Sequence, residues 1–184
     1  LEQMEDETGD DIKKQSYRAM LNNSRRLLGL INQLLELSKF ESGTMKLLAS
    51  HHDVVPFLEG IVSSFQMAAE QKQLELTFKS EPAKIEFYFD GEKMDKIMGN
   101  FLSNALKFTP PGGAVTVSVT VESSESAAPG QAVIAVEDTG IGIPGDQISH
   151  IFDRFYQARS TDSYEGRQKG SGIGLALVKE LVNL

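Results

Sequence analysis

The first forty positions carry apolar residues at intervals of three and four, and this spacing predicts a long amphipathic helix from Ile12 to about Ser42. The residues that share the pattern are Tyr17, Met20, Leu21, Leu27, Leu28, Leu30, Ile31, Leu34, Leu35 and Leu37. The stripe is wider than the seam of a two-stranded coiled coil, so the helix needs several partner helices, as in a four-helix bundle. We therefore expect dimerisation or a further helix before Leu1. Gly43 supplies the C-terminal stop, and the acidic residues 1–11 are expected to form a solvated turn or helix end.

A second pattern begins near residue 45, where short alternating stretches are mixed with helical ones. The predicted elements are a helix capped by Asp53 that runs through Glu70, strands at 74–78 and 85–89, a helix capped by Asp90, strands at 114–122 and 132–138, a short helix at 146–157, and a final helix from Gly172. The last two strands are expected to form a hairpin. The sequence thus predicts an α+β fold with a helical region at 1–44 and a second domain at 45–184.

Composition and charge narrow the function classes. The chain of 184 residues has no cysteine, which excludes disulfides and thiolate metal sites, and no apolar run of the ~20 residues that span a bilayer. Its net charge of -8 argues against non-specific binding to nucleic acid or to anionic membranes. Any phosphate ligand must therefore be held by local groups or by a metal ion.

Polar residues interrupt the helix that follows Asp90. At 100° per residue, Lys93, Asn100, Asn104 and Lys107 fall within roughly 60° of one another. The adjoining core stripe is expected to comprise Met94, Ile97, Phe101, Ala105 and Phe108. An asparagine oxygen suits Mg²⁺, and a lysine one turn on can neutralise phosphate charge. A solvated helix face with two capping amides explains the same residues.

Two glycine-containing stretches also fit a phosphate-bearing ligand. In "DTGIGIP" (138–144), Asp138 ends an apolar run, where a buried carboxylate needs a donor such as an adenine amine, and Gly140 and Gly142 permit close approach to a flat ring. A tight loop capped by aspartate is the alternative. In "KGSGIGLAL" (169–177), glycines open a helix whose N–H groups can meet phosphate. This stretch matches neither a dinucleotide fingerprint nor a Walker loop.

Between these stretches lies "FDRFYQ" (152–157). Phe152 and Phe155 can pin a mobile loop to the core, while Arg154 points the other way and could reach phosphate. A helix with an exposed arginine is an equally good interpretation of this stretch taken alone.

Together the four stretches resemble, in order, the asparagine, first glycine, phenylalanine and second glycine boxes of sensor histidine kinases, and more distantly those of the superfamily that includes gyrase B, Hsp90 and MutL. "RRLLGLINQLLELSKFESGTMKL" (25–47) resembles the second helix of the dimerisation domain, and "LSKFESG" is most similar to bacterial hybrid sensors. The resemblance covers 12–184. It implies a dimerisation helix, half of a helical hairpin, followed by a two-layer α/β sandwich ATP-binding domain that lacks its last strands.

The resemblance also implies roles for individual residues. Asn100 would bind Mg²⁺, Asn104 and Lys107 would contact phosphates, Asp138 would accept from adenine N6, and Arg154, with Arg159 as a second candidate, would meet the γ-phosphate. The base pocket and the lid (157–171) would be completed by Gly140, Gly142, Ile143, Tyr156, Gly170, Gly172, Gly174 and Leu175. Catalysis would depend on Asn100, Lys107 and Arg154. The implied chemistry is phosphoryl transfer from ATP to a histidine and then to a response regulator aspartate.

The sequence departs from the family pattern at the acceptor histidine. "HDVVP" (52–56) imitates its spacing, but it follows the long helix, and Asp53 is better explained as a helix cap. His51 and His150 also lack the acceptor context, so the acceptor is expected upstream of Leu1. The implied partners are a second copy and a receiver domain, with no nucleic acid, and the implied location is the cytoplasmic part of a membrane-anchored sensor. The alternatives are a non-catalytic dimerisation and docking module with a disabled ATP site, and a gyrase-like ATPase, which is disfavoured because Lys96 stands where a catalytic glutamate would be.

Overall fold

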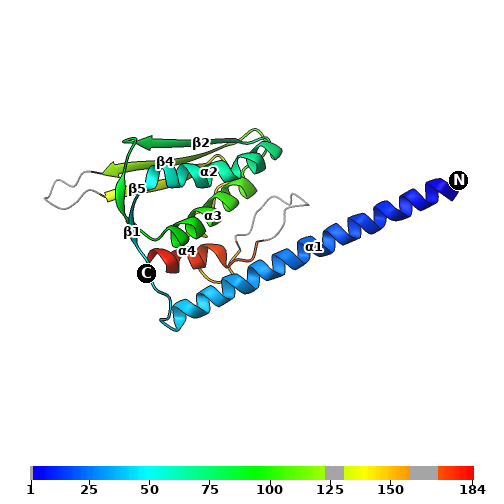
Figure 1. Cartoon of the computed structure of the whole chain (residues 1–184), viewed down its shortest axis with the longest axis horizontal. Helices are drawn as coiled ribbons and strands as arrows, with labels where there is room; N and C mark the ends of the chain where they lie inside the picture. Colours follow the sequence, from blue (N-terminus) through cyan, green and yellow to red (C-terminus); the bar gives the residue numbers. More distant parts are fainter. Residues whose placement is uncertain (1, 123–130, 158–169) are drawn as a thin grey trace.

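The computed structural model describes residues 2–122, 131–157 and 170–184 and shows one long helix leading into a mixed helix and sheet domain. In Figure 1 the helix, α1 (Glu2–Glu41), extends away from the domain, and only its C-terminal part lies beside it. No helix among the described residues is both long enough and apolar enough to cross a membrane. The predicted order of a helical segment followed by an α/β domain is confirmed.

Helix α1 ends as the sequence predicts and begins earlier. Gly43 adopts a positive φ of 64°, and the Thr44 N–H donates to the Lys39 carbonyl over 3.1 Å, a termination that glycine favours. The helix starts at Glu2, so the acidic segment 1–11 is largely helical and not a turn.

A short two-stranded sheet joins α1 to the rest of the domain. Its strands, β1 (Ser50–Asp53) and β3 (Glu86–Phe89), pair antiparallel with His52 opposite Phe87. Strand β1 was not predicted, because its four polar residues show no alternation of apolar side chains. The predicted cap at Asp53 is confirmed: its Oδ1 accepts from the N–H groups of Val55 and Ile85, each over 3.1 Å.

The main sheet has three strands in the order β2-β4-β5. They are β2 (Glu75–Glu81), β4 (Ala114–Glu122) and β5 (Gln131–Asp138). Strand β4 runs parallel to β2 and antiparallel to β5, which confirms the predicted pairing of the last two strands. Alternate residues of β4, namely Val115, Val117 and Val119, are completely buried, so one face of the sheet is the core face.

Helices α2 (Val54–Gln71) and α3 (Gly91–Phe108) cover that face of the sheet, and α4 (Gly174–Val182) lies beside α3 (Figure 1). The main core joins α2, α3 and the strands, with Leu58, Met98 and Leu102 among its most buried side chains. A smaller core joins α1 to α4 through Leu37, Ile173, Leu177 and Leu181. Helix α3 therefore separates two apolar clusters.

This position of α3 corrects the predicted core stripe of that helix. The buried residues are Met98, Leu102, Ala105 and Leu106, whereas Phe108 is exposed and Met94 is only partly buried. Ile97 packs against the smaller core. A helix with apolar neighbours on two sides has no single apolar stripe, so the pattern led to the wrong rotation.

The predicted helix over 146–157 is also wrong. Only a single turn of 3₁₀-helix forms, η1 (Ile148–His150), and the bonds that follow it run from Asp153 to His150 and from Tyr156 to Asp153. Phe155 takes a positive φ of 64° and donates its N–H to the Gly172 carbonyl over 2.8 Å. A left-handed residue bonded outside its own segment cannot continue an α-helix.

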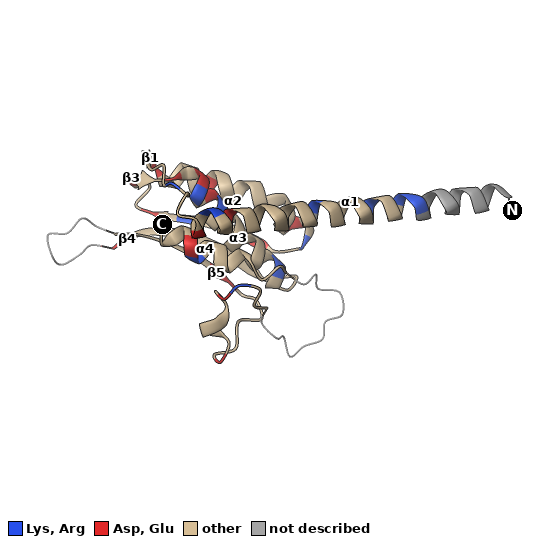
Figure 2. Ribbon diagram, turned by 90° about the horizontal axis from the view of Figure 1, so that it is seen from below, with Lys and Arg blue, Asp and Glu red and all other residues tan. Residues whose placement is uncertain are grey.

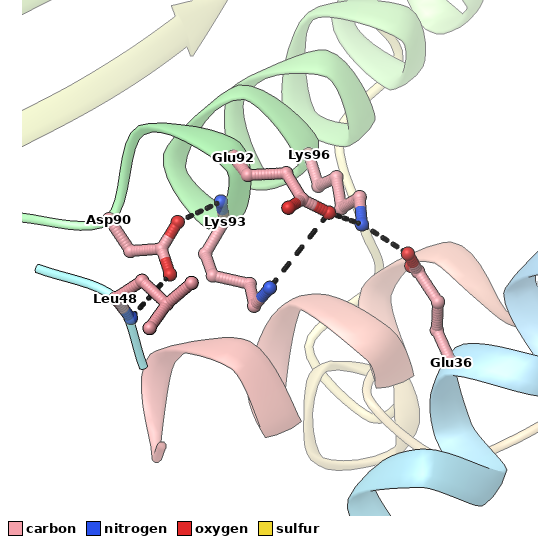
Figure 3. Close-up of polar contacts among 6 residues, drawn as sticks. All are labelled: Glu36, Leu48, Asp90, Glu92, Lys93 and Lys96. Atoms are coloured by element: carbon pink, nitrogen blue, oxygen red, sulfur yellow. Dashed lines mark hydrogen bonds and ion pairs between the residues drawn. The ribbon is translucent and has the colours of Figure 1, made fainter. Parts of the chain in front are cut away.

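Asp90 connects the segment after α1 to the start of α3. Its Oδ1 accepts from the Lys93 N–H over 3.1 Å, as expected of a helix cap, and its Oδ2 accepts from the Leu48 N–H over 2.8 Å (Figure 3). Burial alone would raise the pKa of the Asp90 carboxyl, but the hydrogen bonds from Leu48 and Lys93 outweigh it, and the pKa lies below its ordinary value. The charged form is therefore the one that the fold favours.

We expect Asp90→Ala to lower the free energy of unfolding by about 1–3 kcal/mol, because two N–H groups lose a charged acceptor. The folded-state pKa is depressed, so this contribution is complete above the unfolded value near pH 4 and is lost as the pH falls through the folded value. Urea unfolding at pH 7 and at pH 3 measures both effects. The control is Asp95→Ala, which removes an exposed aspartate from the same helix; equal losses for both variants would contradict the account.

Candidate functional site

The polar side chains predicted to share one side of α3 form a partly buried ridge on that helix. Lys93, Asn100, Asn104 and Lys107 are all half-buried. The Asn100 side-chain amide donates from Nδ2 to the Lys96 carbonyl over 2.8 Å, which fixes the amide plane and leaves Oδ1 on the side of α4. The residues of this ridge are thus held by the helix, and two of them face the glycine stretch 170–174.

That glycine stretch meets the ridge at two points. A Cβ atom built on Gly174, the first residue of α4, would lie 2.4 Å from Asn100 Oδ1, and one built on Gly170 would lie 3.2 Å from Lys107 Nζ. Both distances are closer than ordinary packing of a side-chain carbon permits. Glycine at these positions therefore allows the helix N-terminus to approach the amide and the ammonium group of α3.

The loop after β5 approaches the C-terminal end of α3. The Ile141 N–H lies 3.4 Å from the Phe108 carbonyl, and a Cβ atom on Gly140 would lie 2.8 Å from the same oxygen. Gly142 has a φ of 66°, a left-handed conformation that glycine adopts without strain. Ile143, predicted to line a base pocket, is 45% exposed beside them.

Asp138 itself is exposed, which corrects the expectation of a buried carboxylate. Its Oδ1 accepts from the Gly140 N–H over 2.8 Å, so the aspartate-capped loop that the sequence left open does form. In the described part of the chain Oδ2 receives no hydrogen bond. One oxygen therefore shapes the loop, and the residue as a whole remains exposed.

The stretch 152–157 is tied to the second glycine stretch. A Cβ atom on Gly172, which has a φ of 69°, would lie 2.6 Å from the Phe155 carbonyl carbon. The expected anchoring of this stretch by Phe152 and Phe155 is wrong, because the two rings are 36% and 64% exposed. Backbone contacts with Gly172 hold the stretch instead, and the half-buried Tyr156 donates its hydroxyl to Gln147 Oε1 over 3.2 Å.

Arg154 is engaged by carboxylates of two helices. It forms an ion pair with Glu41, the last residue of α1, and its Nη2 lies 3.8 Å from Glu180 Oε1 of α4. The hydrogen bond and the charge of Glu41 raise the pKa of Arg154 above its ordinary value. The arginine predicted to reach phosphate is therefore paired with acidic side chains in this structure.

Lys96 makes a second connection between α1 and α3. It pairs with Glu92, one turn earlier on α3, over 2.7 Å and with Glu36 of α1 (Figure 3). Burial would lower the pKa of Lys96, but the hydrogen bonds and charges of Glu36 and Glu92 outweigh it and raise the pKa. Figure 2 shows that both acidic and basic residues occur along the described helices and strands.

The remaining predicted residues fall into three groups. Leu175 is half-buried in the first turn of α4. Arg159 and most of the predicted lid, 158–169, lie outside the described residues. Histidines 51, 52 and 150 are exposed; His51 contacts the Tyr88 ring, His52 contacts Phe89, and His150 pairs with Asp153 over 2.9 Å.

Sequence reasoning missed Gln33, Glu36 and Glu41 as neighbours of the site. Gln33 Oε1 accepts from the Ser171 hydroxyl over 3.2 Å, and the two glutamates pair with Lys96 and Arg154. On a long amphipathic helix such residues resemble any solvated polar face, so the pattern carried no signal that could have identified them.

Comparisons with known proteins agree with this arrangement. Residues 89–184, more than half of the chain, match the family described as "Histidine kinase-, DNA gyrase B-, and HSP90-like ATPase". The chain is 34% identical to Histidine kinase P4 of Formosa agariphila over 172 residues, which covers 91% of this chain and 12% of that protein. It is also 34% identical to sensor histidine kinase WalK of Bacillus subtilis, with coverage of 94% and 27%. The chain thus spans about a quarter or less of these two relatives.

A solved structure gives the same result in three dimensions. The crystal structure of full-length ShkA in complex with AMPPNP superposes with a TM-score of 0.71 at 26% identity, over 85% of this chain and 30% of that one. The family match over residues 89–184 contains all four motifs. The chain belongs to the family of histidine kinase-, DNA gyrase B- and HSP90-like ATPases, and it carries an ATP-binding domain of the histidine kinase type.

Proposed function

We propose that this chain binds Mg·ATP between α3 and the glycine stretches and, within a longer kinase, directs the γ-phosphoryl group to a histidine outside residues 1–184 and then to an aspartate of a response regulator. The observation that carries the proposal is the approach of Gly174 and Gly170 to Asn100 and Lys107. It brings a helix N-terminus, an amide oxygen and an ammonium group together, which is a combination suited to a polyphosphate.

Each end of the nucleotide has its own group of residues in this proposal. Asp138 Oδ2 accepts from the exocyclic amine of adenine, and Gly140, Gly142 and Ile143 border the ring. Asn104, Lys107 and the N–H groups at the start of α4 contact the phosphates. The remaining assignments, also supported by the motif match, are Tyr156, Gly170, Gly172, Gly174 and Leu175 as parts of the pocket and lid, with Arg154 and Lys107 at the γ-phosphate.

Asn100 fits the role of a magnesium ligand. Its Nδ2 is occupied by the Lys96 carbonyl, so the oxygen, the hard ligand that Mg²⁺ prefers, is the atom presented toward α4. The described residues contain no cluster of three or more His, Asp or Glu side chains that could hold a metal alone. That fits an ion carried largely by phosphate oxygens and water, and Mg²⁺ bound there would neutralise charge on the transferred group.

Phosphoryl transfer asks the protein for positioning and charge stabilisation more than for covalent chemistry. Lys107 neutralises phosphate oxygens, Asn100 orients the metal-bearing end, and Asp138 fixes the base at the other end. The histidine nitrogen then attacks phosphorus in line as the bond to the β-phosphate oxygen breaks, and the proton of the imidazolium product passes to solvent.

We assign residues 1–44 to dimerisation and 45–184 to ATP binding. The support for a homodimer is the width of the apolar surface left uncovered on α1. Large apolar side chains exposed by 45% or more are Tyr17, Met20, Leu21, Leu27, Leu28, Ile31, Leu34 and Leu35. An apolar face of this extent normally marks an interaction site, and a second copy would bury it in a helical bundle.

The role of the metal is tested with Asn100→Ala. We expect the wild type to bind ATP more tightly in Mg²⁺ than in EDTA, and the variant to lose this difference while its affinity for adenosine is unchanged. Isothermal titration of ATP and adenosine, each with and without Mg²⁺, gives the four affinities required for each protein.

Asn23→Ala provides the matched control, since it removes the same amide from an exposed position on α1. The control should retain the full effect of Mg²⁺. If Asn100→Ala retained it as well, Asn100 would be only a polar residue of the helix face, and the metal assignment would be wrong.

A further inference from the structure

Three side chains of α1 reach three elements of the ATP site. Gln33 bonds to Ser171 in the second glycine stretch, Glu36 pairs with Lys96 one turn before Asn100, and Glu41 pairs with Arg154. Leu37, only 4% exposed, packs between them against Ile173, Leu177 and Leu181. The C-terminal end of α1 therefore contacts the proposed nucleotide site through both polar and apolar side chains.

The pair between Glu41 and Arg154 is unusual, because a glutamate at the C-terminal end of α1 does not stabilise that helix. A negative charge at a helix C-terminus opposes the helix dipole. Here the charge pairs with the guanidinium group, and Glu180 Oε1 of α4 lies 3.8 Å from Nη2 of the same group. The arginine is held by two carboxylates, which are chemical analogues of a phosphate oxygen pair.

We propose that Glu41 is an internal competitor of the γ-phosphate for Arg154, so that docking of α1 and engagement of the arginine by ATP exclude each other. This inference rests on the proposed function, which places Arg154 at the γ-phosphate. ATP then favours release of the end of α1, and ADP, which has no γ-phosphate, does not. Helix docking and nucleotide state are thereby coupled, and the coupling acts in both directions.

The strength of the contact suits such a role. The arginine and Glu41 are 40% and 55% exposed, so water screens their attraction, and an exposed pair of this kind is easily exchanged for a more highly charged phosphate. Glu180 remains near Arg154 when Glu41 leaves, so the arginine stays close to the site. The pair is therefore a reversible contact and contributes little to the permanent stability of the fold.

The test compares ATP with ADP in the whole 184-residue chain. Glu41→Gln should tighten ATP binding by about two- to fivefold, the range expected on weakening one exposed ion pair, and leave ADP affinity unchanged. In an Arg154→Gln background the same change should have no effect on either nucleotide. Glu59→Gln, which removes an exposed glutamate of α2, is the matched control and should change neither affinity.

A structural measurement separates competition from a general change in affinity. Because the chain has no cysteine, Ser38→Cys with Lys179→Cys allows a dye pair to report the separation of α1 and α4. ATP should increase the separation in the wild-type background, and ADP should increase it less. Equal effects of Glu41→Gln on ATP and ADP, no effect on either, or a separation that ATP does not change would overturn the inference. Failure of the wild type to bind ATP would overturn the proposed function and this inference together, whereas the first three results leave ATP binding intact.

Discussion

Leu102→Ala will lower the free energy of unfolding by about 2–5 kcal/mol, the range found when a buried leucine is truncated. Leu102 is completely buried in the middle of α3, within the cluster that joins α2, α3 and the main sheet. The loss combines the transfer free energy of the removed carbons with the cavity left between a helix and a sheet that cannot fully close on it. Urea unfolding followed by circular dichroism measures the change.

The same helix carries Asn100 and Lys107, so the variant also tests the link between fold and site. At temperatures where the variant remains folded, we expect its free energy of ATP binding to change by less than its free energy of unfolding. The reason is that the core side of α3 is opposite to the polar ridge. Leu48→Ala is the control: its side chain is 73% exposed, and the expected loss is below about 0.5 kcal/mol. A loss of that size for Leu102→Ala would contradict the assigned core.

Asp138→Asn will weaken ATP binding by about 1–3 kcal/mol, which corresponds to a factor of about 5 to 150 in Kd. Oδ1 of Asp138 already accepts from the Gly140 N–H. An asparagine keeps that bond with its own oxygen, so its NH₂ group takes the place of Oδ2. A donor would then face the donor amine of adenine, and the hydrogen bond would be lost while the loop is preserved.

Asp146→Asn makes the same chemical change at an exposed position of the same loop and should leave ATP affinity unaltered. Calorimetric titration of both variants with ATP provides the comparison. Equal affinities for Asp138→Asn and the wild type would remove Asp138 from the base pocket.

Local signals in the sequence were sufficient for most of the fold. The caps at Asp53 and Asp90, the stop at Gly43 and the alternation of β4 each depend on a residue and its near neighbours, and each is confirmed. The short strand β1 and the irregular stretch 152–157 depend on partners far along the chain: His52 lies opposite Phe87, and the Phe155 N–H donates to the Gly172 carbonyl. Such elements are decided by tertiary pairing, which a single stretch of sequence does not contain.

In the candidate site, too, some features follow from the local sequence and others depend on distant partners. Asn100, Lys107 and the glycines of 170–174 were identified from their types and spacing, and the structure brings them together. The exposure of Asp138 was not predicted, because the end of an apolar strand can point into the core or out of it. The pairing of Arg154 with Glu41 joins residues that lie far apart in sequence and depends on where α1 docks, so no local pattern could indicate it.

The site around α3 and Asp138 is expected to bind ATP through both its base and its phosphates. Calorimetric titration of the wild-type chain with ATP and with GTP, in the presence of Mg²⁺, tests it most directly. We expect saturable binding of one ATP per chain and much weaker binding of GTP, because guanine presents a carbonyl oxygen where adenine presents the amine from which Asp138 accepts. Equal affinity for the two nucleotides, or no saturable binding of ATP, would contradict it.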